Sequence, residues 1–568
     1  MSGTTGSRAA GSAPVPSRFD LDDDTGRGQG GIRGRQARRL NAPNQLWGSN
    51  GVALGPDGRL YVAQFLAGRI SAVDPVGGDV DTVVPMDSPV QSPDDLAFGA
   101  DGSMYIADLV PGRVWRRSPA GEYTLVADDV TNPNGITCVG DRLFVNEMTF
   151  DGRLLELFPD GGAPRVLTQG LALGNAMQRG PDGHLYYPHM LTGQVWRIPP
   201  DGGAPEVVAE DVHEPVAVRF DQGGVLHVLS RGVEGIVTRI DLHGTGSRTL
   251  VTSGLVGLDN AAFDTENRMY VTSYASGGVT ELHPDGRTRE LVPRGLDGPY
   301  GVTIDLGGTV YAADHYRVAS PAATHEGEPS SAGRAAATGG VTTHTLLMFA
   351  HGIVADGDLL HLTSQYGQVQ THDRTTGTTR ERVAGLRQPT GIALRPDGTL
   401  LVAETGAGRV IAVAADDTVT VVAEGLDRPV DVAVAPDGHC YAGESRLGSV
   451  LRLDDGGPVT VAEGMGTPEG LAVLGDDLYL VDTAHRTLRA VDLTTGRTRT
   501  EAEDLPVGPP PGVVPRATPA LIAGGGLPGL AAPFAGLAAT PDGALLLSAN
   551  GEGTVLRIEP AARRTPDD

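Results

Sequence analysis

The stretch NGVALGPDGRLYVAQFLAGRISAVDP, residues 50–75, decides the fold because the chain repeats its pattern. A short apolar run reaches a Pro-Asp-Gly turn, a second apolar run follows, and a loop of small residues leads to a third. The same order recurs in PTGIALRPDGTLLVAETGAGRVIAVAADD (389–417) and PVDVAVAPDGHCYAGESRLGSVLRLDD (429–455). Asp-Gly tolerates the positive φ of a tight hairpin, and a fourth run such as TVTVVAEGL (418–426) completes the unit. The unit is therefore predicted to be a four-stranded antiparallel meander, a propeller blade.

Twelve such units can be counted along the chain. Their first strands lie near Gly51, Asp95, Gly135, Ala176, Ala217, Ala261, Gly301, Gly352, Gly391, Asp431, Gly470 and Gly536. Propellers usually hold about four to eight blades, so twelve units predict an all-β protein of two six-bladed β-propellers, residues 35–298 and 299–568. A single large ring is the alternative. Residues 1–34 lack periodicity and are predicted to be a disordered tail.

The sequence leaves two possibilities for how the second ring closes. The last unit ends at TVLRIEPAARR (554–564) without an evident fourth strand, and QARRLNAP (36–43) resembles an isolated fourth strand. The favoured interpretation is a three-stranded last blade and a plain division into two rings. In the alternative, QARRLNAP completes the last blade and brings the two ends of the chain together.

Two insertions interrupt the period, at about residues 317–343 and 505–533. The first is interpreted as following a second strand, and the second as preceding a first strand. In an up-and-down blade these connections open onto the same end of the ring. We therefore expect both insertions to cover the mouth of the second propeller, as a lid or as simple surface growth.

Composition excludes several functions. All 44 basic residues of the 568 are Arg, which rules out a Schiff-base lysine and a Walker-type phosphate loop. The net charge of −26 argues against nucleic acid binding, which requires basic surface, and is compatible with cations. No apolar run approaches the ~20 residues of a membrane span, and no secretory signal is visible, so a cytoplasmic protein without membrane contact is expected. Cys138 and Cys440 are expected to be free thiols.

Polar residues are expected to gather at one mouth of each propeller, where first strands begin and second strands end. We call these residues openers and closers. In the first propeller five openers are Asn or Asp, namely Asn50, Asp94, Asn134, Asn175 and Asn260. Converging carboxylate and amide oxygens suit a hard divalent cation, of which Ca²⁺ is the main candidate. The alternative is that Asn and Asp only bond nearby backbone amides.

The second mouth contains more titratable groups. Its openers include His351 and Glu469, and its closers include Glu404, Glu444 and Asp482. Clustered carboxylates raise one another's pKa, and a histidine among them titrates near neutral pH, so these five residues are the candidate catalytic acid and base. The alternative is that they are solvated or bond a neighbouring strand.

The blade motif PNGITCVGDRLFVNE (133–147), like that at 389–413, resembles the SMP-30/gluconolactonase and strictosidine-synthase-like propellers, and NHL-repeat proteins are similar. The lactonase branch of that family holds a divalent cation with Asn, Asp and Glu at first-strand openings. The resemblance implies that role for the five openers of the first propeller and for Glu469 in the second. Two propellers instead of one, and no Glu among the first openers, depart from the family pattern.

These observations favour a metal-assisted enzyme on a small organic substrate, with lactone or ester hydrolysis as the leading reaction and cyclisation or elimination in specialised metabolism as a variant. Two alternatives stay open. One is a metal-free condensing enzyme that resembles strictosidine synthase and uses a glutamate of the second propeller. The other is a non-catalytic scaffold that binds a protein partner.

Overall fold

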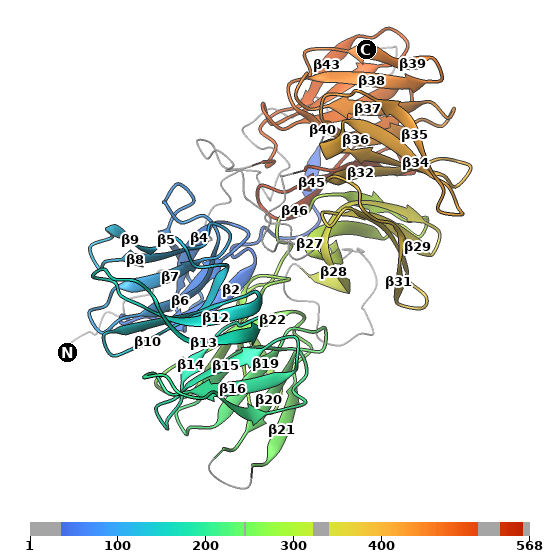
Figure 1. Ribbon diagram of the computed structural model, residues 1–568. Helices are drawn as coiled ribbons and strands as arrows, with labels where there is room; N and C mark the ends of the chain where they lie inside the picture. The colour runs from blue at the N-terminus through green and yellow to red at the C-terminus, as the bar shows by residue number, and fades with distance from the viewer. Residues whose placement is uncertain (1–35, 243–245, 322–339, 509–533, 560–568) are drawn as a thin grey trace, which may run out of the picture.

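The computed structural model describes residues 36–242, 246–321, 340–508 and 534–559. Apart from one 3-10 turn, η1 (Thr405–Ala407), the regular elements of these ranges are strands, which confirms the predicted all-β class. Figure 1 shows two lobes, one coloured blue to green and one yellow to red. No helix in the described ranges has the length and hydrophobicity needed to cross a membrane. The tail predicted at residues 1–34 lies outside the described residues.

The first propeller consists of six four-stranded antiparallel sheets in chain order. Blades 1 to 3 contain β2 (Ser49–Leu54), β3 (Leu60–Gln64), β4 (Arg69–Val73), β5 (Val80–Val84), β6 (Pro93–Phe98), β7 (Met104–Asp108), β8 (Arg113–Arg117), β9 (Tyr123–Ala127), β10 (Pro133–Val139), β11 (Arg142–Glu147), β12 (Phe150–Leu157) and β13 (Arg165–Ala172). Blades 4 to 6 contain β14 (Gln178–Arg179), β15 (Leu185–His189), β16 (Gln194–Ile198), β17 (Glu206–Ala209), β18 (Pro215–Phe220), β19 (Leu226–Ser230), β20 (Ile236–Ile240), β21 (Arg248–Thr252), β22 (Leu258–Phe263), β23 (Met269–Ser273), β24 (Val279–Leu282) and β25 (Thr288–Val292). β2 packs on β22 and β23, which closes this ring.

The second propeller contains the remaining strands. Blades 7 and 8 contain β26 (Val302–Ile304), β27 (Val310–Pro321), β28 (Val341–Asp356), β29 (Leu359–Ser364), β30 (Gln368–Asp373) and β31 (Thr378–Val383). Blades 9 to 12 contain β32 (Pro389–Leu394), β33 (Leu400–Glu404), β34 (Arg409–Val413), β35 (Val419–Glu424), β36 (Pro429–Val434), β37 (Cys440–Glu444), β38 (Ser449–Asp454), β39 (Gly457–Ala462), β40 (Pro468–Leu474), β41 (Asp477–Asp482), β42 (Thr487–Asp492), β43 (Thr498–Ala502), β44 (Leu537–Ala539), β45 (Leu545–Ala549), β46 (Thr554–Ile558) and β1 (Ala37–Arg39). β26 packs on β44 and β45, which closes the second ring.

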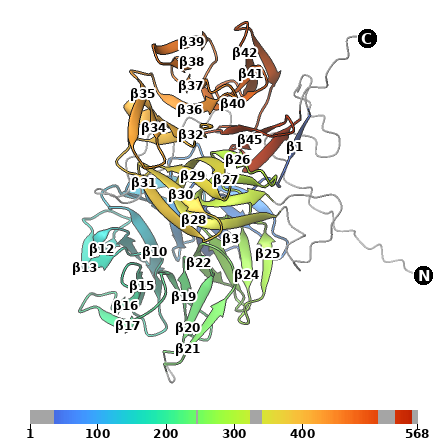
Figure 2. The same cartoon turned by 90° about the vertical axis from the view of Figure 1, so that its right-hand side faces the viewer.

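The pairing of β1 corrects the favoured expectation of a three-stranded last blade. Ala37 and Arg39 pair antiparallel with Ile558 and Leu556 of β46, so β1 is the fourth strand of blade 12. Figure 2 shows β1, in blue, at the edge of the last blade. Residues 37–39, which the sequence analysis counted with the first propeller, therefore belong to the second. The first propeller is an insertion between β1 and β26.

Blades 7 and 8 form one six-stranded sheet because β27 pairs with both β26 and β28, and β28 pairs with both β27 and β29. β27 pairs with β26 through Val310 and with β28 through Pro321. A straight strand rises ~3.3 Å per residue. If β27 were straight, Tyr311 near its start would lie far from His344, which lies near the start of β28, opposite the end of β27. The Tyr311 and His344 ring centroids are only 5.0 Å apart, so β27 turns back, and it does so at His315, which has a φ of 50°.

This reversal corrects the expected position of the first insertion. Pro321 pairs with Val341 at the far tip of the hairpin, near Tyr311, whose hydroxyl donates to Asp305 in the turn between β26 and β27. That turn is the equivalent of the Pro-Asp-Gly turns, at the opposite end of the blade from the mouth. Residues 317–321 and 341–343 are strand, and they end on the face of the turn between β26 and β27 and not at the second mouth. Residues 322–339 and 509–533 lie outside the described residues.

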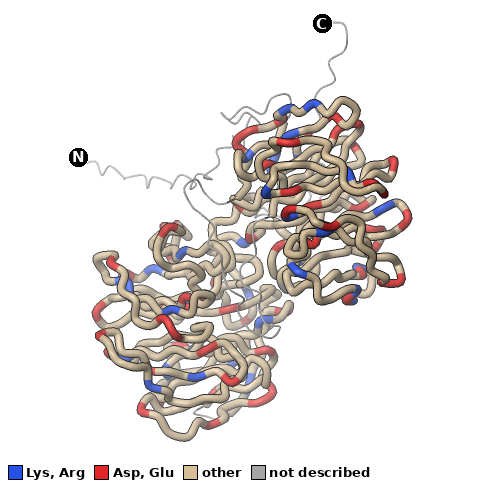
Figure 3. Tube along the Cα trace, turned by 45° about the horizontal axis from the view of Figure 1, so that its top comes forward, with Lys and Arg blue, Asp and Glu red and all other residues tan. Residues whose placement is uncertain are grey.

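The core lies between neighbouring blades. Ile70 of β4 and Ile106 of β7, for example, are completely buried in one cluster shared by blades 1 and 2. Charged residues are distributed along the chain in both lobes, with Asp and Glu more numerous than Arg (Figure 3). Because every blade buries its faces in this way, the first strands are held rigidly around each axis, and their openers meet at the mouths.

Candidate functional site

The openers of the first propeller face its axis, and five of its six first strands, β2, β6, β10, β18 and β22, start with an irregular pairing. In β6, for example, the register with β7 shifts between Pro93 and Asp95, and in β22 the register with β23 shifts between Leu258 and Ala261. A bulge releases the residue between the paired positions from the ladder and turns it inward. In β22 that residue is Asp259, not Asn260. Asn260 points sideways and donates from Nδ2 to Asp95 Oδ1 at 3.1 Å.

These openers line a cavity of about 70 Å³ on the axis. Asn50, Asp94, Asn134, Asn175 and Asp259 supply the polar wall. Four of the five predicted residues therefore line one cavity, with Asp259 in the place of Asn260, and their role as metal ligands stays a prediction. A cavity of this size has room for one ion and a few water molecules.

Two of the polar groups are carboxyl groups that burial disfavours as anions. Burial raises the pKa of Asp94 to about 8, with the charge of Asp95 adding to the effect. Burial also raises the pKa of Asp259 well above its ordinary value, with Asp94 and Asp95 contributing. Two such groups on one cavity favour a state in which a proton or a cation compensates their charge.

Amide oxygens complete the donor set. Asn50 Oδ1 and Asn134 Oδ1 are buried without a hydrogen-bond partner, although Asn50 Nδ2 donates to Asp94 Oδ2 at 3.4 Å. Asn175 differs, because its Oδ1 accepts the N–H of Ala176 at 2.6 Å. Asn50, Asp94, Asn134 and Asp259 therefore offer four oxygens of the kind that Ca²⁺ prefers. In the described ranges no three His, Cys, Asp or Glu residues are grouped to hold a metal, so a cation here depends on the two amides.

The second propeller closes this cavity. Tyr316, from the turn of β27, lines it beside Tyr274 of the first propeller, and the two rings meet edge to face with centroids 5.0 Å apart. Tyr316 packs in turn on Phe349, which is fully buried and has a φ of 55°. A bulky residue in the left-handed region is uncommon and marks a constrained position. The mouth of the first propeller is thus covered by aromatic residues of the second.

The second mouth holds His351 among aromatic rings. His351 packs edge to face on Tyr300, with centroids 4.5 Å apart, and against Phe534 at 5.6 Å. Tyr300, Val430 and Phe534 form a buried cluster that closes the mouth end of the axis. Burial lowers the pKa of the neighbouring His315 to about 3, and His351 adds to that shift. Aromatic and aliphatic side chains therefore surround His351, and Tyr300, Val430 and Phe534 form an apolar plug at this mouth.

The carboxylates predicted beside His351 hold backbone amides instead. Glu404 accepts the N–H of Arg387 at 2.8 Å, Glu444 that of Asp427 at 2.9 Å, and Asp482 that of Thr467 at 3.0 Å. Each donor lies in the loop that leads into the carboxylate's own blade. The catalytic role of these residues stays an untested prediction, and the described geometry gives them a structural one.

Glu469 is placed differently. Its two oxygens accept from the Thr483 hydroxyl and the Ala535 N–H, each at 3.0 Å. Burial raises its pKa to about 7. Glu469 is therefore suited to exchange a proton near neutral pH, although both of its oxygens already have partners.

Sequence reasoning missed Asp259 and Tyr316. Asp259 could have been found by aligning LDN at 258–260 with PDD at 93–95, because both place an Asp directly after the residue that pairs with the closer. Tyr316 carried no signal, because its position depends on the packing of one propeller against the other.

Comparisons with known proteins do not assign a function to the chain. No family model matches the chain, and no curated protein matches it. Among solved structures, a streptogramin B lyase is 18% identical with a TM-score of 0.36, over 49% of this chain and 94% of its own. A gluconolactonase from Xanthomonas campestris is 16% identical with a TM-score of 0.36, over 47% and 96%. A calcium-binding protein, regucalcin, from Agrobacterium tumefaciens is 20% identical with a TM-score of 0.35, over 43% and 86%. At these values the function has to be argued from the site itself.

Proposed function

We propose that the protein is a metal-assisted enzyme whose site is the covered mouth of the first propeller, and that it hydrolyses a lactone or ester of a small organic acid. One observation carries the proposal: two buried carboxyl groups and two unpartnered amide oxygens meet on one small cavity. Asp94, Asp259, Asn50 and Asn134 would hold a divalent cation, with Ca²⁺ as the first candidate. When bound, such a cation polarises a carbonyl and lowers the pKa of water.

The cavity as described has room for an ion and water, so a substrate would reach the cation only after the cover of Tyr274 and Tyr316 opens. Tyr274 and Tyr316 exclude bulk water, which strengthens the electrostatic interactions inside. Arg231 lines the same cavity and offers the positive charge that a carboxylate product would need.

The test combines metal content with activity. Elemental analysis of the purified protein should find about one divalent ion per chain, and a panel of small lactones and esters should be hydrolysed in a chelator-sensitive manner. Asp94→Asn and Asp259→Asn should each lower metal content and rate. Glu404→Gln is the matched control, a buried carboxylate of the second propeller whose replacement should leave both unchanged. Full metal-free turnover, or normal metal content in both Asp variants, would refute the proposal.

Glu469 keeps the metal-free condensing enzyme as a second candidate, because its pKa of about 7 suits an acid–base residue. In that case Glu469→Gln should abolish a chelator-insensitive activity, whereas Asp94→Asn should have no effect on rate. A protein that turns over nothing but captures a defined partner would instead favour the scaffold.

A further inference from the structure

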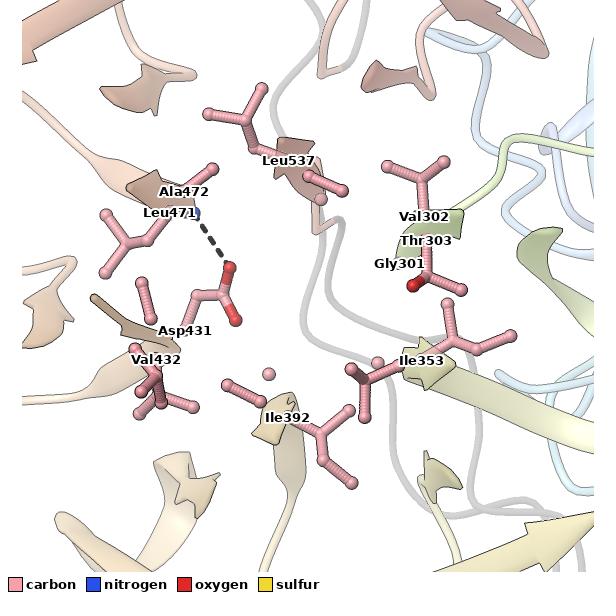
Figure 4. Close-up of a pocket in the computed structure, with 18 of the residues that line it drawn as sticks. Gly301, Val302, Thr303, Ile353, Ile392, Asp431, Val432, Leu471, Ala472 and Leu537 are labelled. Carbon is pink, nitrogen blue, oxygen red and sulfur yellow. Dashed lines mark hydrogen bonds between the residues drawn. The ribbon is translucent and has the colours of Figure 1, made fainter. Parts of the chain in front are cut away.

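A second, separate cavity of about 210 Å³ runs along the axis of the second propeller (Figure 4). Its walls are largely apolar and include Val302, Ile353, Ile392 and Leu537. Phe534 lines its mouth end, where the plug of Tyr300, Val430 and Phe534 closes it. At the other end the lining residues Val354, Leu394, Val434, Val473 and Ala539 are half-buried, so the channel opens on the face of the Pro-Asp-Gly turns.

One carboxyl group projects into this channel. Asp431 is only 5% exposed, and its Oδ2 accepts the N–H of Leu471 at 2.8 Å. No Arg or His is among the residues that line the described channel. Burial raises the pKa of Asp431 well above its ordinary value, with the charge of Glu469 adding to it. A buried carboxylate without a cation is costly, so the channel lacks the partner that would complete it.

The first propeller shows what that partner is. Asp95 follows the opener of its blade as Asp431 does, and its Oδ2 accepts the N–H of Ile136 as Asp431 accepts that of Leu471. Across the channel, Arg219 Nη2 lies 3.8 Å from Asp95 Oδ2. The Arg219 guanidinium also donates to the carbonyls of Ala261 at 2.9 Å and Met177 at 3.0 Å. A guanidinium on an apolar stem therefore fills the first channel.

The second channel keeps the carboxyl group and lacks the arginine. Arg219 is the third residue after the opener Val216, in the blade opposite Asp95. The same position opposite Asp431 is the third residue after Tyr300, which is Thr303. Figure 4 shows Thr303 on the other side of the channel from Asp431, with open space between them. Ile353 and Leu537, in the blades on either side of Thr303, occupy the positions that Ala261 and Met177 occupy on either side of Arg219 in the first propeller.

We propose that this channel binds a small organic cation, a guanidinium or ammonium group on a short apolar stem. The charged head pairs with Asp431 and donates to the backbone carbonyls of Ile353 and Leu537, as Arg219 does to their counterparts. The stem lies against the aliphatic walls, toward the open end. A neutral molecule of the same shape would leave the carboxyl group without its cation and bind weakly.

Calorimetric titration of the full-length protein tests the proposal with n-butylguanidinium and n-butylammonium as probes and n-butanol as the neutral control. The wild type should bind one cation per chain, and the thermal midpoint should rise with cation concentration. n-Butanol should show no saturable binding. Asp431→Asn should weaken cation binding by about tenfold or more, because it removes a hydrogen bond to a charged group.

Thr303→Arg supplies the missing side chain and should block cation binding, which makes it an independent check if Asp431→Asn folds poorly. Arg219→Ala is the reciprocal variant: it opens the first channel, and n-butylguanidinium should restore part of its lost thermal stability. Absence of saturable cation binding by the wild type would overturn the proposal. Equal binding of n-butanol, undiminished cation binding by Asp431→Asn, or persistent cation binding by Thr303→Arg would overturn it as well.

Discussion

At the scale of single residues, the closers form a repeated clamp. A side-chain oxygen at the end of a second strand accepts an N–H from the loop that enters the same blade, usually 15 to 17 residues earlier. Gln64, Asp108, Glu147, Asp314, Glu404, Glu444 and Asp482 all do this. Because a glutamine fills the position in blade 1, the clamp requires an acceptor and not a charge. The acidic character of the second mouth therefore reflects loop anchoring.

The clamp predicts that substitutions of Glu404 change the stability of the fold but not its metal content. Glu404→Ala removes the acceptor of the part-buried Arg387 N–H and should destabilise the fold by ~1.5–3 kcal/mol, because a hydrogen bond to a charged group contributes about that amount. Glu404→Gln should retain most of the stability. Both can be compared by the midpoint of thermal unfolding. Equal loss in the two variants would show that the charge, through Arg409, matters more than the acceptor.

The raised pKa of Asp94 predicts the pH dependence of the metal-free protein. The native carboxyl holds its proton up to about pH 8, whereas in the unfolded chain it titrates near 3.8. Asp94 thus keeps a proton in the native state that it loses in the unfolded chain between these values, so its contribution to the free energy of unfolding falls as the pH rises from about 4 to about 8. Asp94→Asn should remove this contribution, and added Ca²⁺ should oppose it in the wild type. Denaturation curves of the two proteins at several pH values, with and without chelator, measure the difference. The same pH dependence in the wild type and in Asp94→Asn would contradict the prediction.

At the scale of strands, the pairing of β1 is a feature that could not be predicted from the sequence. The blade pattern was visible because each blade is local in sequence, and the predicted fold class follows from it. The fourth strand of blade 12 is three residues long and about five hundred residues from its partner, so no local signal could choose between the two closures. The same holds for the reversal within β27, where His315 adopts a positive φ and no Gly marks the turn.

The pairing of β1 predicts a sharp boundary for truncation. Arg39 forms a buried ion pair with Glu552, at 2.8 Å, and Asn41 exchanges hydrogen bonds with Val555 and Gly553. Removal of residues 1–35 should leave the thermal midpoint unchanged, whereas removal of residues 1–41 should lower it, because the edge of β46 is then exposed. Differential scanning calorimetry of the two truncated proteins provides the comparison. Identical midpoints would mean that β1 contributes little to closure.

At the scale of the whole molecule, the first propeller is inserted into the second. Its two ends meet, since Asn44 Nδ2 donates to Asp297 Oδ1 at 2.8 Å and to the carbonyl of Leu296 at 3.1 Å. This connection holds the two rings together, and the aromatic cluster of Tyr274, Tyr316, Phe349 and Tyr366 packs between them. The ring of polar openers could be predicted from the sequence, because it follows from the blade period. The cover over it could not, because it is a contact between two distant repeats.

That cover predicts how access to the first cavity is controlled. Tyr316 and Tyr366 belong to the same aromatic cluster, but only Tyr316 lines the cavity. Tyr316→Ala should therefore open the mouth and speed the release of a bound divalent ion to a chelator, whereas Tyr366→Ala should lose comparable packing without that change. Tyr316→Phe keeps the ring and should release the ion as slowly as the wild type. Stopped-flow measurement of ion release compares the three variants with the wild type. If Tyr316→Ala and Tyr366→Ala accelerate release equally, loosening of the contact between the propellers, and not removal of the cover, controls access.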